Sequence, residues 1–518
     1  MISKTTTGLF FLLLFSIVSY AQDTKHPNVL FIMCDDLNDY LGAFGGHKQV
    51  HTPNIDKLAA SGTVFLNAQS NAPVCQPSRN SIFTGVYPHD SKDYAWTPML
   101  KQPVLKHNKT LIQLFKENGY KTLGSGKLTH GKPPKEWMEW GMDHTINYGP
   151  AYFNGEKNVA HPAVPAPYNT IGAVDGSYGR LSTAGTSSGI KGEKGWVLGW
   201  KKIPMRYIND QDRDLLPDER HAAWAQQKFQ EMALNEDPQP FFMGVGFVRP
   251  HTPLHAPDKY FDMYPIDEID LNPWLENDEA DTFWLENFSD KKKGPKYYKM
   301  LVESYDGDRE LALKHFLQAY LACVTFVDVQ IGKVLDALNA SQFKDNTIVV
   351  FTSDHGWQMG EKSYLFKNSP WEKSARVPLI LKTPGTKGGE RVAHPVSLVD
   401  LFPTLIDYCQ LEGSHKKNEQ GGDLGGHSLR PLIEKTNDWK GPNGALTIVG
   451  NYGKNIPTSG QNFSYRTKQY RYISYGNGKE ELYDHAIDPN EFTNVAGDKK
   501  YKKIKKELKK EMQEILNQ

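Results

Sequence analysis

The sequence predicts an α/β fold with a large, mostly parallel central sheet flanked by helices, and a smaller antiparallel subdomain at the C-terminus. Three observations support this prediction. Short β-rich runs alternate with helical patterns along most of the 518-residue chain, as in folds built from parallel strands and crossover helices. Polar residues directly follow several of these runs. Beyond about residue 441 the alternation stops, and aromatic-rich strand patterns replace it.

The predicted elements follow one another from residue 28. Asn28–Met33 (NVLFIM) has the continuous apolar character of a buried parallel strand. Thr52, Pro53 and Gly62 provide an N-cap, a first-turn proline and a terminal glycine around a helix over 54–60. The strand predicted over 241–247 is expected to break at Arg249-Pro250-His251. The remaining predictions are helices over 110–118, 311–339 and 397–407, and strands over 120–125 and 347–352.

Candidate functional residues fall where the predicted strands end. Ligands of open α/β sheets bind beside the carboxyl ends of strands, so this placement predicts a site at one edge of the sheet. The residues are Asp35, Asp36, His251, Asp354 and His355. Each also has an ordinary interpretation, because paired aspartates begin loops or cap helices and most histidines are surface or satisfied core groups.

Two stretches, about 147–214 and 258–308, match no regular element and are rich in aromatic residues. Long irregular insertions are often functional, so stacking on sugar rings and plain surface loops both remain open. Further on, 463–474 and 480–483 are predicted strands of the C-terminal subdomain. A basic amphipathic helix over 499–516 is expected to close it, with its lysines forming a solvated face.

The composition is that of a globular protein without a nucleic-acid partner. Hydrophobic residues make up 39% and charged residues 23% of the chain. Lys+Arg and Asp+Glu both number 60, so the formal net charge is zero and no global basic surface is expected.

The N-terminus carries a predicted targeting segment. Lys4 precedes an apolar run over 8–18, and the small residues Ser19 and Ala21 suit signal peptidase. The run is too short to span a membrane comfortably. We therefore expect residues 1–21 to be a signal peptide of a periplasmic or secreted protein, with an N-terminal anchor as the alternative. No other stretch is apolar enough to span a membrane.

The four cysteines show no CxxC pair and no disulfide framework. Cys34, Cys323 and Cys409 lie in apolar contexts and are predicted to be buried core thiols. Cys75 instead lies in a polar, proline-bounded segment, Pro73–Arg79. A free or modified cysteine, a thiol hydrolase that pairs Cys75 with a histidine, and a structural cysteine at a turn all remain open on these grounds.

Cys75-Gln76-Pro77-Ser78-Arg79, followed by Thr84-Gly85, resembles the signature of type I sulfatases (C-x-P-S-R…T-G). Other segments follow in family order: Asp35-Asp36, Gly126–His130, Arg249-Pro250-His251, Thr352–Gly356, Lys367 and Leu401–Leu405. The resemblance covers nearly the whole mature chain. It is greatest to the iduronate-2-sulfatase-like subgroup, which includes bacterial enzymes acting on algal polysaccharides, and it implies an alkaline-phosphatase-like fold. Arg249 stands where some relatives carry lysine, a departure that would affect substrate binding.

The resemblance also implies cofactors and roles. Cys75 would be oxidised to formylglycine by a formylglycine-generating enzyme, and its hydrate would be the nucleophile. Calcium suits several hard oxygen ligands. The implied metal ligands are Asp35, Asp36, Cys75 (as the hydrate), Asp354 and His355, and histidine is the poorer match among them. Arg79 would orient the hydrate, Lys127 and Lys367 would bind sulfate, His251 or Lys367 would protonate the leaving group, and His130 would act as a base.

By this resemblance, residues 22–440 form the catalytic domain and 441–518 the C-terminal subdomain. The implied reaction is hydrolysis of sulfate esters on a carbohydrate, such as the algal polysaccharide ulvan. A phosphodiesterase or phosphonate monoester hydrolase of the same superfamily is the alternative. A non-catalytic glycan-binding protein is a further one, although the complete set of candidate residues argues against it. No membrane span is expected in the mature chain.

Overall fold

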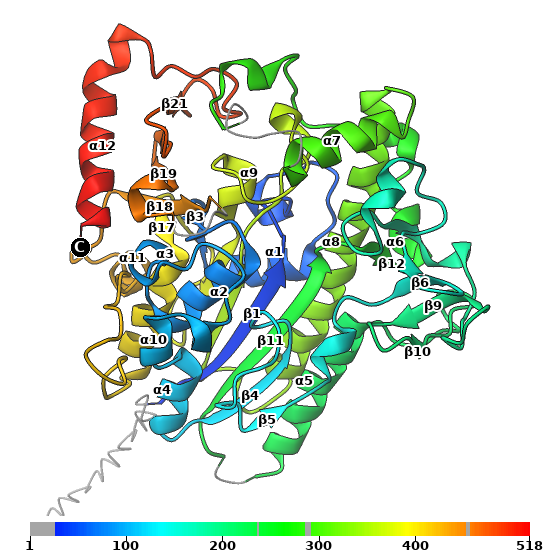
Figure 1. Ribbon diagram of the computed structural model, residues 1–518. Helices are drawn as coiled ribbons and strands as arrows, with labels where there is room; N and C mark the ends of the chain where they lie inside the picture. Colours follow the sequence, from blue (N-terminus) through cyan, green and yellow to red (C-terminus); the bar gives the residue numbers. More distant parts are fainter. Residues whose placement is uncertain (1–25, 236–237, 285–291, 452–455, 518) are drawn as a thin grey trace, which may run out of the picture.

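The computed structural model describes residues 26–235, 238–284, 292–451 and 456–517. An eight-stranded sheet with the order β16-β2-β15-β13-β1-β11-β4-β5 forms its centre (Figure 1). The strands from β13 to β5 run parallel, while β15 is antiparallel to both of its neighbours. A mostly parallel sheet is thus confirmed. The bounds are β1 Asn28–Asp35, β2 Thr63–Phe65, β4 Lys121–Gly126, β5 Glu139–Trp140, β11 Phe241–Pro250, β13 Thr347–Ser353, β15 Leu379–Lys382 and β16 Glu390–Val392.

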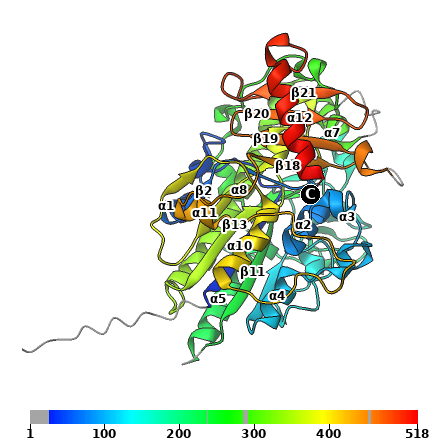
Figure 2. The same cartoon turned by 90° about the vertical axis from the view of Figure 1, so that its left-hand side faces the viewer.

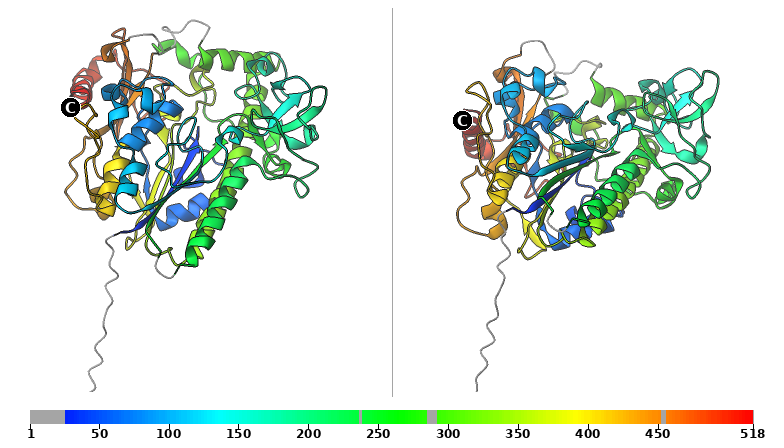
Figure 3. Two further views of the ribbon diagram at one scale, coloured as in Figure 1. Left: turned by 60° about the horizontal axis from the view of Figure 1, so that its bottom comes forward. Right: turned by 90° about the horizontal axis from the view of Figure 1, so that it is seen from below.

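Helices cover both faces of this sheet (Figure 3). On β1, Leu30, Ile32 and Cys34 belong to one core, and the alternate residues Val29, Phe31 and Met33 belong to the other. This is the period-two division expected of a strand buried on both faces. The first core is shared with α1 (Pro53–Ser61), α5 (Pro217–Ala233) and α8 (Arg309–Asn339), and the second with α2 (Cys75–Thr84), α4 (Leu111–Glu117) and α10 (Leu401–Cys409).

Two details differ from the sequence predictions. The Thr52 side chain does not cap α1; its hydroxyl instead accepts a hydrogen bond from the Gly42 amide at 3.0 Å. The strand predicted over 241–247 is three residues longer, and it ends at Pro250, within the predicted break at Arg249-Pro250-His251. The reason is that the Asp218 carboxylate of α5 accepts hydrogen bonds from the amides of Val248 and Arg249, both at 2.9 Å, in place of a neighbouring strand.

The irregular stretch near 147–214 contains a small sheet that the sequence did not predict. It has the order β10-β9-β6-β7 and projects at the right of Figure 1. Its strands contain only two to five residues, too few for a periodic pattern to be recognised. Their bounds are β6 Ala151–Asn154, β7 Asn158–Val159, β9 Lys194–Leu198 and β10 Ile203–Pro204.

The C-terminal subdomain is antiparallel, as predicted. Its sheet has the order β18-β19-β20-β21, and α12 (Lys502–Leu516) packs against it (Figure 2). Leu508, Met512 and Ile515 of α12 are buried against this sheet. Most of the helix's lysines are exposed. The strand bounds are β18 Gly444–Val449, β19 Asn462–Thr467, β20 Tyr470–Ser474 and β21 Glu480–Asp484.

Cys34, Cys323 and Cys409 are buried and unpaired, as predicted. The predicted signal peptide, residues 1–21, lies outside the described residues. Among the helices within the described ranges, none is both long and apolar enough to cross a bilayer.

Candidate active site

Four neighbouring parallel strands, β13, β1, β11 and β4, end at the same edge of the sheet. Each carries candidate residues at or just beyond its carboxyl end, as expected for this class of fold. Asp36, which follows β1, has a left-handed backbone with φ 63°, a strained conformation that often marks functional sites. At this edge, β13 contributes Asp354 and His355, β1 contributes Asp35 and Asp36, β11 contributes His251, and β4 contributes Lys127.

Cys75 begins α2 and is only 2% exposed. Its Sγ lies 3.2 Å from Lys367 Nζ, 3.3 Å from His355 Nε2 and 3.8 Å from Lys127 Nζ. Helix N-termini favour negative charge, and two ammonium groups add to that preference here. The helix N-terminus and the lysines therefore favour an anion beside Cys75, although burial disfavours charge on the thiol itself.

The aspartates pair with these cations. Lys367 Nζ lies 2.8 Å from Asp36 Oδ1, and Lys127 Nζ forms an ion pair with Asp35. His251 Nε2 lies 3.6 Å from Asp36 Oδ2. Burial raises the pKa of Asp36 to about 7 despite the nearby Lys367. The cluster is thus a buried arrangement of carboxylates and ammonium groups.

Arg79, one helical turn after Cys75, is fully buried. Its Nε donates a hydrogen bond to Asp354 Oδ2 at 2.7 Å, and its guanidinium also bonds the backbone carbonyls of Lys127 and Leu128. Burial would raise the pKa of Asp354, but Arg79 and His355 hold it below its usual value. Arg79 therefore fixes the carboxylate and the loop after β4.

The candidate histidines are neutral at neutral pH. Burial lowers the pKa of His355 and of His130 to about 3, and burial together with Lys367 and Lys127 lowers that of His251 well below its usual value. His251 Nδ1 lies against the Thr252 carbonyl oxygen at 2.5 Å. His130 is half-buried at the border of the cluster. Among the described residues, none forms a hydrogen bond with its ring.

Part of the predicted ligand set has the geometry of a metal site. One ligand atom each from Asp35, Asp36, Cys75 and His355 lies within 4.8 Å of the others. Asp35 Oδ1 and Asp36 Oδ2 are buried and accept no hydrogen bond in the described chain, although such atoms normally have partners. Unsatisfied carboxylate oxygens fit a hard cation such as calcium. Asp354 lies beside this group, and both of its oxygens already accept hydrogen bonds.

The close approach of His355 to Cys75 also resembles a thiol–imidazole pair. Burial, Asp354 and Asp36, however, raise the pKa of the Cys75 thiol to about 12, against the effect of Lys367. A nucleophilic cysteine needs the opposite shift, because the thiolate is the reactive form. The surroundings of Cys75 therefore disfavour a thiol hydrolase.

Sequence reasoning missed Tyr148 and Asp175. The Tyr148 ring lies 4.7 Å from Lys127 Nζ and 5.2 Å from the His251 ring. Asp175 accepts hydrogen bonds from Thr252, the neighbour of His251, at 3.2 Å and from Lys293 at 2.9 Å. Both belong to the irregular stretch of 147–214, where no local signal shows which side chains reach the site.

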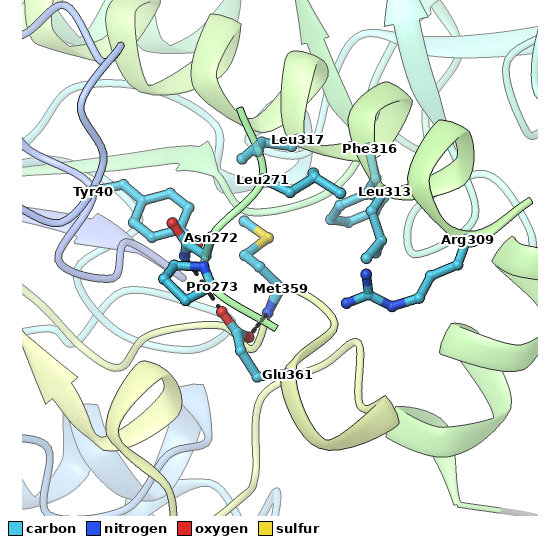
Figure 4. Close-up of a pocket in the computed structure, with 10 residues that line it drawn as sticks. All are labelled: Tyr40, Leu271, Asn272, Pro273, Arg309, Leu313, Phe316, Leu317, Met359 and Glu361. Atoms are coloured by element: carbon cyan, nitrogen blue, oxygen red, sulfur yellow. Dashed lines mark hydrogen bonds between the residues drawn. The ribbon is translucent and has the colours of Figure 1, made fainter. Parts of the chain in front are cut away.

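Two of the described cavities adjoin loops that carry site residues. One of about 880 Å³ is lined by Asp39, Gln358 and Lys373, which follow the site residues on the same loops. A smaller pocket shares Asn272 and Glu361 with it (Figure 4). None of the candidate site residues lines either space. The candidate active site is therefore identified from the arrangement of its side chains and not from a cavity.

Comparison with known proteins agrees with this geometry. A profile of the sulfatase family matches residues 27–411, and a profile of the N-sulphoglucosamine sulphohydrolase C-terminal region matches residues 360–518. A sulfatase of Formosa agariphila is 33% identical over 491 residues, covering 93% of this chain and 85% of that protein. Human iduronate 2-sulfatase is 29% identical over 77% of this chain and 67% of that protein.

Solved structures share the fold. A phosphonate monoester hydrolase from Silicibacter pomeroyi superimposes with a TM-score of 0.70 at 22% identity, over 94% of both chains. A 2-O GAG sulfatase superimposes with a TM-score of 0.66 at 22% identity, over 95% of this chain and 92% of that chain. At such identity these structures establish the fold only, and the reaction has to be inferred from the residues of the site.

Proposed function

Because this chain belongs to the sulfatase family and is a sulfuric ester hydrolase, we propose that it removes sulfate from a carbohydrate with the help of formylglycine at position 75 and of calcium. The observation that carries this proposal is the position of Cys75, at a helix N-terminus and within 3.8 Å of two lysines and a histidine. The paired aspartates beside it supply oxygen ligands.

Asp35, Asp36, Asp354, His355 and residue 75 would hold the metal. When bound, calcium would offset the negative charge of the sulfate ester, and the formylglycine hydrate would supply the attacking oxygen. Of the proposed ligands, the two aspartates with unsatisfied oxygens fit this role best.

The lysines bind sulfate in this proposal. Lys367 and Lys127 both approach the position of the nucleophile, so their ammonium groups can contact sulfate oxygens and stabilise charge that develops there. Burial would lower the pKa of Lys367, but Asp36 and Cys75 raise it, which keeps Lys367 cationic. Burial and Lys367 lower the pKa of Lys127, so Lys367 is the stronger proposed sulfate ligand. Arg79 positions Asp354, the proposed acceptor of the nucleophile's proton.

His251, Lys367 and His130 are the proposed proton-transfer groups. His251 and Lys367 lie on opposite oxygens of Asp36. Lys367 is cationic and carries a proton for the leaving group, whereas His251 is neutral and would first have to take one up. His130 is neutral and so has the free lone pair that a general base needs. The three roles are proposals that rest on the position of these groups in or beside the cluster of carboxylates and lysines.

The names of similar structures support a proposed substrate class. One similar structure contains D-glucosamine-2-N,6-O-disulfate, and another is named as a 2-O GAG sulfatase. We propose a sulfated oligosaccharide or polysaccharide, algal ulvan included, as substrate. We also propose a formylglycine-generating enzyme as the maturation partner, and a periplasmic or secreted location.

A substrate panel with a Cys75→Ser control tests the function. Protein matured with a formylglycine-generating enzyme should release sulfate from aryl sulfate and sulfated oligosaccharides. It should act far less on an aryl phosphodiester or phosphonate. Cys75→Ser should still bind substrate but lose turnover by at least about 10³-fold, because the nucleophile is removed. Preferential phosphodiester or phosphonate cleavage, or turnover by Cys75→Ser at the normal rate, would reject the proposal.

A further inference from the structure

Tyr148 lies beside two proposed site residues without being part of the sulfatase signature. Its ring centre is 4.7 Å from Lys127 Nζ, within the range of a cation–π interaction. The same ring meets His251 edge-on, at 5.2 Å and an interplanar angle of 72°. Tyr148 is half-buried, and none of the described residues forms a hydrogen bond with its hydroxyl.

Buried side chains hold the chain on both sides of Tyr148, through the Asn147 side chain before it and through backbone carbonyls after it. His221 Nε2 lies 3.0 Å from Asn147 Oδ1. Arg249 donates a hydrogen bond to the Gly149 carbonyl at 2.9 Å, and His255 Nδ1 donates one to the Pro150 carbonyl at 2.9 Å. His221, Arg249 and His255 are all buried. Since three such groups fix residues 147–150, the Tyr148 ring has a defined position despite belonging to an irregular segment.

The same contacts explain how Arg249 acts on the site. The sequence suggested that this arginine, in place of lysine, would affect substrate binding. Its guanidinium instead bonds the backbone carbonyls of Gly149 and His255 and is buried. Its effect on the site therefore passes through the segment that carries Tyr148.

We infer that Tyr148 is a positioning residue whose ring fixes the ammonium group of Lys127 and the imidazole of His251 for sulfate binding. Lys127 is buried, Asp35 holds it on one side, and the Tyr148 ring lies against it. Burial and the neighbouring Lys367 lower the pKa of Lys127, whereas both of these contacts favour its cationic form. A desolvated ammonium group gains more from an aromatic face than an exposed one does. This inference rests on the proposed sulfatase function.

Three variants separate the effect of the Tyr148 ring from the effect of its hydroxyl and from the effect of general packing. Tyr148→Leu removes the ring, and Tyr148→Phe keeps it. Tyr152→Leu is the matched control, because Tyr152 is also half-buried and packs edge-on against Trp196 at 6.0 Å, away from the cluster. Turnover of 4-nitrophenyl sulfate and the affinity for inorganic sulfate are both measured, so that binding is followed even without turnover.

Tyr148→Leu should lower kcat/KM and sulfate affinity about 10-fold, since both depend on the position of Lys127. Tyr148→Phe should keep kcat/KM and sulfate affinity within about twofold of the values of the chain with Tyr148, because the ring is retained. In a Lys127→Met background, Tyr148→Leu should weaken sulfate affinity by less than about twofold, because its effect is exerted through Lys127.

Two results would overturn the inference. One is equal loss in Tyr148→Phe and Tyr148→Leu, which would assign the effect to the hydroxyl. The other is full additivity with Lys127→Met, or losses matched by Tyr152→Leu, which would indicate general packing. A further outcome is that the chain without substitutions binds sulfate in the expected Tyr148-dependent way and yet cleaves no sulfate ester. In that case the proposed function fails and the positioning role stands.

Discussion

Burial has different consequences for Cys75 and for the two aspartates of the candidate site, Asp35 and Asp36. It raises the pKa of Cys75 to about 12, so an unmodified thiol would remain protonated at neutral pH and react poorly. Burial also leaves oxygens of Asp35 and Asp36 without hydrogen bonds, which favours a cation at the same place. A site that disables a thiol while accommodating a metal agrees with conversion of Cys75 to another group.

The leaving-group acid can be identified from substrate reactivity. A 4-nitrophenyl leaving group needs no proton, whereas a sugar alcohol does. We expect replacement of the true acid, His251→Ala or Lys367→Ala, to slow sulfated-sugar hydrolysis about 10²- to 10⁴-fold. The same change should slow 4-nitrophenyl sulfate hydrolysis much less.

Comparison of the two substrates for each variant checks this prediction. A residue that only binds sulfate should reduce both rates by a similar factor. Equal losses on both substrates for both variants would exclude His251 and Lys367 as the acid.

At the residue scale, prediction from sequence was limited to residues with local signals. Asp35, Asp36 and Asp354 follow recognisable strands, and Cys75 lies in a specific motif. Tyr148 and Asp175 have no such signal, because only the folded course of 147–214 brings them to the site. The exact partners of Arg79 were also unpredictable, since they are backbone carbonyls of a distant loop.

At the scale of elements, a buried ion network links the C-terminal sheet to the catalytic loops. Arg471 of β20 bonds Glu372, at the start of α9 (Glu372–Ala375), and Glu491. Arg466 of β19 also bonds Glu372, at 3.2 Å. Glu372 lies five residues after Lys367, so this network anchors the segment that carries a proposed sulfate ligand.

Breaking the network should destabilise the protein strongly. Arg471→Met removes a fully buried cation from Glu372 and Glu491, which keep only Arg466 and His485 as partners, and removal of one member of a buried pair costs about 3–5 kcal/mol. Thermal unfolding should show a clear fall in Tm. The exposed i,i+4 pair of Lys503 and Glu507 supplies the control, Lys503→Met, which should change Tm little. A similar Tm for both variants would contradict this account.

The network also predicts a pH dependence. Burial alone would raise the pKa of Glu491, but Arg471 and His485 hold it below its usual value. Its stabilising contribution is therefore present above the unfolded-state pKa of about 4.3 and is lost as the pH falls. The stability difference between the unmodified chain and Glu491→Gln, measured by urea unfolding, should shrink between about pH 6 and pH 3. A difference that grows on acidification would contradict the sign.

Elements were predictable where they were long. The strands at 28–35, 241–250 and 347–353 and the helix at 309–339 each contain enough residues for a clear apolar pattern. The two- to five-residue strands between 151 and 204 do not, and their pairing depends on tertiary contacts.

At the scale of the whole molecule, the site joins four strands, the N-terminus of α2 and the loop before α9. A cation that binds the folded site alone should therefore stabilise the entire fold, by about 2.7 kcal/mol at a concentration of 100 times its Kd. We expect Tm to rise with added calcium and to fall with a chelator. Asp35→Asn, which removes one proposed ligand charge, should lose most of this shift. A calcium effect of equal size in Asp35→Asn would place the ion elsewhere.

The proposed chemistry depends on an aldehyde at position 75. Its most direct test is to prepare the protein with graded amounts of a formylglycine-generating enzyme and to determine by mass spectrometry the fraction of chains converted at Cys75. The rate of sulfate release from a sulfated oligosaccharide should rise in proportion to that fraction and approach zero without conversion. A rate that is substantial in unconverted protein, or independent of the converted fraction, would contradict the account.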